Sequence, residues 1–176
     1  MRKLLFKNLI QRPLTDPRPP ADDAILADLA ERLETSTRRV LGRSLSIREV
    51  DAGSCNGCEL EIHALSNVYY DLERFGLHFV ASPRHADVLM VTGPVTKNMR
   101  EALERTYNAT PDPKWVVAVG DCALDGGIFA GSYACVGGVS AVVPVDLHIR
   151  GCPPNPTAIL KGLIALVESK EVAGPR

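Results

Sequence analysis

The sequence lacks a second pair of closely spaced cysteines. Cys55 and Cys58 form a C-x-x-C pair, whereas Cys122, Cys135 and Cys152 each stand alone. An odd total of five does not suit a framework of disulfides, in which cysteines are used in pairs. If Cys55 and Cys58 bind a metal group, the remaining protein ligands must come from distant parts of the chain.

Long apolar runs and a strong excess of one charge are also missing. The best apolar stretch, residues 158–167, contains Lys161 and falls short of the roughly 20 residues that span a bilayer. A net charge of −1 provides no broad basic surface for nucleic acid, so we expect no nucleic-acid partner. A chain of 176 residues with 45% hydrophobic content suits one soluble globular domain.

The N-terminal segment resembles a signal peptide only in part. Its apolar stretch is broken by Lys7 and Asn8, and no small-residue cleavage site follows, so we expect an intracellular protein. In a reducing compartment, cysteines favour metal ligation over disulfides. The basic arm Arg2 to Arg12 suits docking on a membrane surface or a partner, but a frayed tail is an equally good interpretation.

Apolar spacing predicts alternating strands and helices. A helix is predicted over residues 22–33, and a domain boundary separates an N-terminal arm and helix, residues 1–44, from an α/β domain, residues 45–176. Within that domain we expect strands at 45–50, 77–81, 86–93 and 115–121, and helices at 60–75, after Thr96 and after Asn155. This alternation predicts a doubly wound, mainly parallel sheet with helices on both faces.

Four of the cysteines follow predicted strands or precede predicted helices. Cys55 and Cys58 lie in the loop after the first strand, Cys122 directly follows the strand at 115–121, and Cys152 precedes the last helix. Loops at the carboxyl ends of parallel strands converge on one edge of the sheet. We therefore expect these four thiols to meet there, whereas Cys135, in the loop SYACVGG, has no comparable position.

Four converging thiolates suit either a tetrahedral zinc ion or an iron–sulfur cluster. Zinc sites usually show two short paired spacings, and this chain has one. A larger cluster needs room, which glycines beside the cysteines would provide: Gly53, Gly57, Gly120, Gly126, Gly127 and Gly151. The residues alone leave a cluster, a zinc ion and unligated core thiols open.

Three motifs, GSCNGCELE, GDCALDGG and GCPPNP in this order, resemble the iron–sulfur small subunit shared by [NiFe] hydrogenases and respiratory complex I. The resemblance covers roughly residues 45–170. It implies a flavodoxin-like α/β fold with an N-terminal extension. It also implies one [4Fe-4S] cluster at the carboxyl ends of the strands, ligated by Cys55, Cys58, Cys122 and Cys152. Cys135 has no place in that ligand set.

The spacing of the first pair indicates a branch of this superfamily. The complex I 20 kDa subunit typically has two adjacent cysteines there, whereas CNGCE is similar to the membrane-bound, energy-converting hydrogenases of the formate hydrogenlyase and CO-linked type. Uptake hydrogenase small subunits are longer, begin with a twin-arginine export signal and carry cysteines for further clusters. The resemblance thus implies a compact subunit with a single cluster.

The resemblance implies that this chain transfers electrons and catalyses no reaction by itself. Electrons would pass between the active site of a NiFe large subunit and a ferredoxin-like iron–sulfur subunit, in a complex with integral membrane subunits. The chain would then be peripheral, on the cytoplasmic side of the inner membrane. The alternative within the superfamily is a complex I type subunit that passes electrons to quinone.

Two other classes of protein are alternatives. A zinc-stabilised interaction module would use the same thiols without electron transfer, and a flavin-binding domain would share the fold. The first strand–helix loop offers cysteines and Glu59 rather than the Ser/Thr-rich turn that holds a phosphate. Glu59 suits a partner interface or a proton path, although acids are favoured at helix starts by the helix dipole. The histidines show no metal-ligand spacing: His63, His78, His85 and His148.

Overall fold

The computed structural model describes residues 23–173, and the predicted basic arm lies outside the described residues. Within this range the main sheet has five strands in the order β2-β1-β3-β5-β7, and every neighbouring pair is parallel. This is the flavodoxin-like strand order, in which the order of successive strands reverses between β1 and β3. The predicted α/β fold class is confirmed. The strands are β1 Leu45–Asp51, β2 Leu77–Phe79, β3 Val88–Thr92, β5 Trp115–Val119 and β7 Leu147–Ile149.

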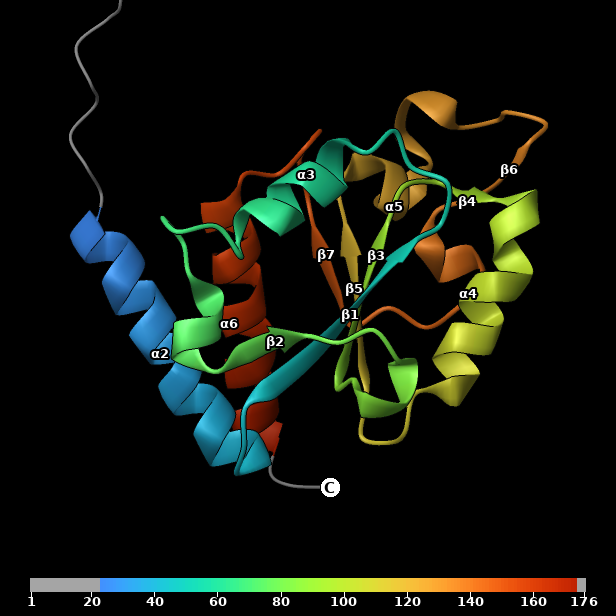
Figure 1. The fold of residues 1–176 in the computed structure, drawn as a ribbon. Helices are drawn as coiled ribbons and strands as arrows, with labels where there is room; N and C mark the ends of the chain where they lie inside the picture. Colours follow the sequence, from blue (N-terminus) through green and yellow to red (C-terminus); the bar gives the residue numbers. More distant parts are fainter. Residues whose placement is uncertain (1–22, 174–176) are drawn as a thin grey trace, which may run out of the picture.

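Helices cover both faces of the sheet (Figure 1). One face carries α2 (Asp23–Leu41), α3 (Gly57–Ala64) and α6 (Pro156–Ala173), and α2 lies beside α6. The other face carries α4 (Lys97–Ala109) and α5 (Asp121–Asp125). Two hydrophobic clusters therefore lie on opposite sides of the sheet.

The central strands are buried on both faces. Val88 and Met90 belong to the cluster under α2 and α6, whereas Leu89 and Val91 belong to the cluster under α4. All five residues of β5 are buried as well. Burial on both faces explains why the amino-acid sequences of these strands are almost entirely apolar.

The predicted helix over residues 60–75 is wrong in extent. α3 ends at Ala64, and a separate 3-10 turn, η1, covers Leu72–Phe75. Between them the side-chain oxygen of Asn67 accepts hydrogen bonds from the backbone N–H groups of Tyr69 (2.8 Å) and Tyr70 (3.0 Å). This Asx turn satisfies backbone donors that a continuing helix would have used.

The helices predicted after Asn155 and after Thr96 are both present, but only Asn155 caps its helix with its side chain. Asn155 caps α6, since its side-chain oxygen accepts from the N–H of Ala158 at 2.8 Å. Thr96 precedes α4 as predicted, but its hydroxyl donates to the carbonyl of Ala52 at 3.2 Å instead of capping the helix.

The helix predicted over residues 22–33 is longer in the structure, since α2 runs to Leu41. Leu29 and Leu33 of α2 are buried in the same cluster as residues of the sheet. A docking role for residues 1–44 and the domain boundary after residue 44 stay predictions.

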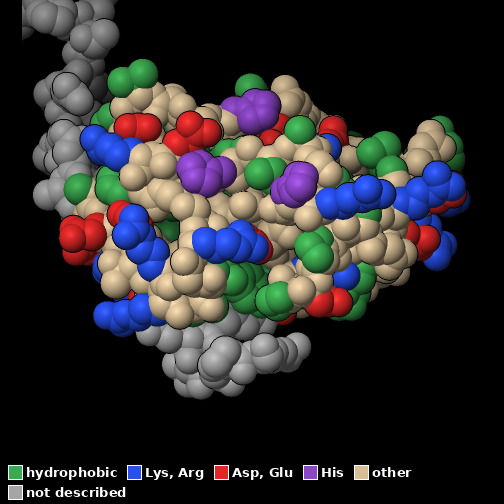
Figure 2. Space-filling view, turned by 60° about the horizontal axis from the view of Figure 1, so that its bottom comes forward, with side chains coloured by type: hydrophobic (Ala, Val, Ile, Leu, Met, Phe, Trp, Pro, Cys, Tyr) green, Lys and Arg blue, Asp and Glu red, His purple; other side chains and the backbone are tan. Residues whose placement is uncertain are grey.

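Smaller elements complete the fold. An antiparallel pair joins β4 (Val95–Thr96) to β6 (Cys135–Gly137), and short 3-10 turns cover Pro83–His85, Gly127–Phe129 and Val139–Ala141. Figure 2 shows a face on which histidine, basic and acidic side chains lie among scattered hydrophobic ones. No helix in the described range 23–173 is long and apolar enough to cross a membrane.

Candidate functional site

Three strand ends bring four cysteines to one edge of the sheet. Cys55 lies in the loop after β1 and Cys58 in the first turn of α3. Cys122 lies in α5, directly after β5, and Cys152 follows β7. Because β1, β5 and β7 are parallel members of one sheet, these loops lie at its carboxyl edge, where Figure 1 shows α3 and α5.

The four thiols are close enough to affect one another electrostatically. Burial first, and then negative charge at Glu59, Cys55, Cys122 and Cys152, together raise the pKa of Cys58 to about 12. Burial also raises the pKa of Cys122, and charge at Cys152 and Cys55 acts in the same direction. The structure therefore brings together the four cysteines that the sequence grouped.

Cys135 lies elsewhere. It begins β6, where it is opposite Thr96 in the antiparallel pair with β4. Cys135 thus begins a short strand rather than lying in the predicted loop, and it does not follow a strand of the main sheet as the other four cysteines do.

Glycines leave room at the sulfur atoms. A Cβ atom on Gly127 would lie 2.9 Å from the Sγ atom of Cys122, and one on Gly57 would lie 3.5 Å from that of Cys55. Gly127 also has a positive φ of 51°, a conformation that other residues adopt at a cost. Space beside these sulfurs therefore depends on residues without side chains.

Backbone hydrogen bonds tie the loop of Cys122 to the loop of Cys152. The N–H of Asp121 donates to the carbonyl of Gly151 at 2.9 Å, and the Asp121 carboxylate accepts from the N–H of Gly151 at 3.1 Å. This reciprocal pair fixes two of the cysteines relative to each other. Asp121 therefore has a structural role beside Cys122.

The loop that carries Cys55 is fixed in a similar way. The Asp51 carboxylate accepts hydrogen bonds from the N–H groups of Gly53 (2.7 Å) and Ser54 (2.8 Å). The loop after β3 packs closely against the loop that carries Cys55. A Cβ atom on Gly93 would lie only 2.5 Å from the Cα atom of Ser54.

Glu59 is buried rather than exposed at the start of α3. Its Oε1 atom accepts hydrogen bonds from the hydroxyls of Ser54 (2.5 Å) and Thr92. Its Oε2 atom is buried and has no hydrogen-bond partner within the described part of the chain. Glu59 thus joins α3, the cysteine loop and the end of β3, which a general preference for acids at helix starts does not explain.

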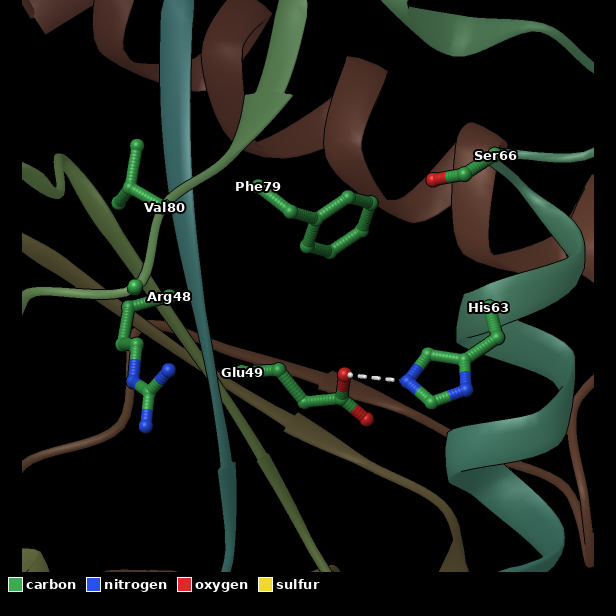
Figure 3. Close-up of a pocket in the computed structure, with 7 residues that line it drawn as sticks. Arg48, Glu49, His63, Ser66, Phe79 and Val80 are labelled. Atoms are coloured by element: carbon green, nitrogen blue, oxygen red, sulfur yellow. Dashed lines mark ion pairs between the residues drawn. The ribbon is translucent and has the colours of Figure 1, made fainter.

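Sequence reasoning missed a hollow of about 330 Å³ between β1, α3 and the segment after β2. In it Glu49 and His63 face each other (Figure 3). The two residues belong to different elements and form no motif, so a sequence pattern could not have found them.

Across residues 23–173, no three His, Cys, Asp or Glu side chains are grouped closely enough to hold a single metal ion.

Comparison with known proteins gives a family and several relatives. Residues 55–166 match the family described as NADH ubiquinone oxidoreductase, 20 Kd subunit. The chain is 46% identical over 130 residues to the probable membrane-bound hydrogenase subunit mbhJ of Pyrococcus furiosus. The matched residues cover 74% of this chain and 78% of that protein. It is 45% identical over 141 residues to formate hydrogenlyase subunit 7 of Escherichia coli, covering 78% of this chain and 55% of that protein.

Two solved structures are similar. A chain of the membrane-bound sulfane sulfur reductase, an archaeal respiratory membrane complex, superposes with a TM-score of 0.66 at 37% identity, covering 81% of this chain and 77% of that one. A chain of an NAD⁺-reducing [NiFe]-hydrogenase gives 0.56 at 20% identity, covering 72% and 93%, and shows the shared fold alone. The family match and these relatives confirm the resemblance seen in the cysteine motifs: the chain belongs to the family of the 20 Kd subunit of NADH ubiquinone oxidoreductase.

Proposed function

We propose that this chain is the electron-transfer subunit of a membrane-bound, H₂-evolving [NiFe] hydrogenase complex. Cys55, Cys58, Cys122 and Cys152 would hold one [4Fe-4S] cluster. The observation that carries the proposal is the meeting of these four thiols from three strand-end loops at one edge of the sheet.

The residues present fit such a group. Each donor is a thiol, and thiolates are the ligands that iron–sulfur clusters take. Gly120 and Gly127 leave space directly against two of the sulfurs. Burial first, and then the negative charge of Glu59 and of the other three cysteines, raise the pKa of Cys58, so both effects oppose its deprotonation. A cationic iron–sulfur core would remove that opposition, since metal ligation requires the deprotonated thiol.

When bound, such a cluster accepts and releases one electron at a time. The chain's own part is to hold the four sulfurs in place. The Asp121–Gly151 hydrogen bonds fix the loops of Cys122 and Cys152, and Glu59 fixes α3 to the loop of Cys55. A rigid, partly buried setting of this kind tunes the potential of a cluster through burial and N–H contacts.

The proposed partners are a NiFe large subunit, a ferredoxin-like iron–sulfur subunit and integral membrane subunits. Support comes from the names of two relatives, a membrane-bound hydrogenase subunit and a formate hydrogenlyase subunit. The complex would hold this chain peripherally, on the cytoplasmic side of the inner membrane. Residues 1–44 would serve docking, and residues 45–176 would bind the cluster.

A second candidate is a complex I type subunit that passes electrons to quinone. The family match over residues 55–166 favours it, because that family is described by the NADH ubiquinone oxidoreductase subunit. The C-x-x-C spacing of Cys55 and Cys58 favours the hydrogenase branch instead.

The test is anaerobic purification of the native complex, followed by iron, sulfide, zinc and nickel analysis and electron paramagnetic resonance. The proposal predicts four irons and four sulfides assigned to this chain, and nickel in a partner. Zinc bound to these cysteines in place of iron would overturn it. Hydrogenase turnover by the purified chain alone would overturn the division of labour between the subunits.

A further inference from the structure

We propose that the open edge of β1 at Glu49 accepts an extended segment of a partner subunit as an added strand. The inference rests on the proposed function, which places this chain in a complex with other subunits. It concerns a surface outside the four cysteines. The mode of docking is strand addition, in which backbone hydrogen bonds join two chains as they join the strands of one sheet.

β1 is longer than the strand that covers one of its sides. β1 runs over Leu45–Asp51, whereas β2 covers only Leu77–Phe79, and the paired register stops at Ile47 opposite Phe79. On the other side, β3 pairs with β1 from Ile47 to Asp51. In the main sheet of the described residues, the second half of β1 therefore has a neighbouring strand on one side only.

The hydrogen bonds show which backbone groups face the open side. The carbonyl of Ile47 accepts from the N–H of Val80 at 2.8 Å, on the side of β2. The carbonyl of Ser46 accepts from the N–H of Asp87 at 2.8 Å, on the side of β3. Backbone groups of successive residues point to alternate sides of a strand, so those of Glu49 point away from β3, as those of Ile47 do. Because β2 has ended there, the N–H and C=O groups of Glu49 face an unfilled position in the sheet.

A hollow of about 330 Å³ lies where β2 would have continued. Phe79, Val80 and Ala81 line it at the end of β2, and Arg48 and Glu49 line it on the side of β1. The chain after β2 thus leaves space beside β1 instead of filling it. Side chains of an added strand would enter this space.

Two buried polar atoms of the lining residues lack partners within residues 23–173. They are the Nε atom of Arg48, which is a donor, and the Oε1 atom of Glu49, which is an acceptor. Buried polar atoms without a hydrogen bond cost free energy. Figure 3 shows that Arg48 and Glu49 extend to different sides of β1. A polypeptide carries an acceptor and a donor at almost every residue, so an added segment supplies what each atom lacks.

Glu49 does not have the position of a charge that protects an edge. Protecting charges project from an edge strand and oppose its pairing with another chain. The Glu49 side chain is only 18% exposed, and its Oε2 atom lies 3.4 Å from the Nε2 atom of His63 in α3. The carboxyl group thus lies toward α3, over one face of the sheet, and does not guard the edge.

The position and charge of the opening favour a partner subunit as the occupant. Asp51 ends β1 and leads into the loop that carries Cys55. Under the proposed function, a partner must bring its own electron carrier close to that loop, so its polypeptide lies beside the open half of β1. Glu49 and Asp51 place two carboxylates on one face of this half. The segment therefore carries a basic side chain on that face.

The test is amide hydrogen exchange, resolved to single residues, in the full chain alone and in the intact complex. The Glu49 amide should exchange at least about tenfold more slowly in the complex, because an added strand provides an acceptor and excludes water. The amides of Arg48 and Val50 face β3 and are internal controls that should be protected in both samples. Equal exchange at Glu49 overturns the inference. Equally fast exchange means that water covers the edge, and equally slow exchange means that this chain covers it.

Two variants at one position separate the backbone from the side chain. Glu49→Pro removes the outward N–H group and leaves the pairing with β3, because proline is tolerated where an N–H faces away from the sheet. Glu49→Ala removes the same carboxylate but keeps the N–H group. The amount of partner subunits that purify with a tagged chain should fall further in Glu49→Pro than in Glu49→Ala. An equal loss in both variants overturns the inference.

Glu101→Ala is the control for the loss of one negative charge. Glu101 is an exposed acid of α4 that pairs with Arg105 at 2.5 Å, so this variant should retain its partners as the wild type does. Should Glu49→Pro fail to fold, as judged by denaturant unfolding, the exchange measurement on the wild type decides.

A photo-cross-linking residue in place of Ala81 identifies the occupant, since Ala81 is exposed and lines the hollow. The inference expects a cross-link to one segment of a partner subunit. Cross-links only to this chain or to a second copy of it overturn the inference. A complex with nickel and the cluster but an unprotected Glu49 amide leaves the proposed function standing. Zinc at the cysteines overturns the proposed function, whatever the exchange result.

Discussion

A Cβ atom on Gly120 would lie 2.6 Å from the Sγ atom of Cys58, closer than real side chains approach. Gly120 ends the segment after β5 and has a φ of 91°. The sulfur of the first motif therefore lies directly against the backbone of the second. The two motifs are far apart in the sequence, and the site depends on this contact.

Replacement of Gly120 by alanine should reduce cluster occupancy. The added methyl group would push the Cys58 sulfur away, and the backbone of Gly120 (φ 91°, ψ 160°) has a conformation essentially restricted to glycine, which adds strain of roughly 1–3 kcal/mol. We expect Gly120→Ala to lose most of its bound iron. Gly131→Ala is the control, since Gly131 has a φ of 77° but no atom within 4 Å of an added Cβ. Equal iron content in the two variants would contradict the steric argument.

Each of the four thiols should be required for the cluster, and the fifth should not. Cys122→Ser and Cys152→Ser should each lose the cluster or hold it weakly, because a thiolate ligand is missing. Cys135→Ser should keep it, since Cys135 lies in β6. Iron and sulfide content per chain provides the measurement. Loss of the cluster in the Cys135 variant alone would overturn the ligand assignment.

Removal of the Thr92 hydroxyl should destabilise the fold. Thr92→Val would leave the buried carboxylate of Glu59 with one hydrogen-bond donor fewer, at a cost of about 1–3 kcal/mol in the free energy of unfolding. Thr92→Ser retains the hydroxyl and should stay near wild type. Denaturant unfolding of the full chain without its cluster measures both. A similar loss in both variants would mean that the methyl group of Thr92, rather than its hydroxyl, is the source.

The free energy of unfolding should also depend on pH through Glu49. Its pKa is raised in the folded chain, chiefly by burial, so the folded state binds this proton more tightly than the unfolded state. Stability should therefore decrease as pH rises from the ordinary value of 4.5 through the folded pKa. Glu49→Gln should remove this part of the pH dependence, whereas Glu101→Gln should not. An unchanged slope in Glu49→Gln would contradict the raised pKa.

The composition of the native complex should separate the branches of the family. If this chain holds the one proposed cluster, electrons must leave it through another protein. We expect nickel, a large subunit, a ferredoxin-like subunit and membrane subunits to purify with it. Flavin, many iron–sulfur centres and quinone reduction without nickel would favour the complex I type.

Deletion of residues 1–12 should weaken assembly or membrane retention while the cluster stays in place.

Local patterns in the sequence were sufficient for much of the fold. Nearly continuous apolar residues predicted the strands β3 and β5, because burial on both faces of the sheet favours apolar side chains. Asn155 marked the start of α6, since capping depends on neighbouring residues. The cysteines could be grouped because parallel strands all end at one edge of a sheet.

The remaining features depend on contacts between residues far apart in the sequence. The break after Ala64 follows from the side chain of Asn67, which competes with the helix in a way that apolar spacing does not report. The burial of Glu59 requires Thr92 of β3, and the pairing of Glu49 with His63 requires that α3 lies against β1. The sequence alone determined which residues are apolar and where the thiols stand relative to the strands. Only the tertiary structure decided which polar side chains face one another, because that depends on how separate elements pack.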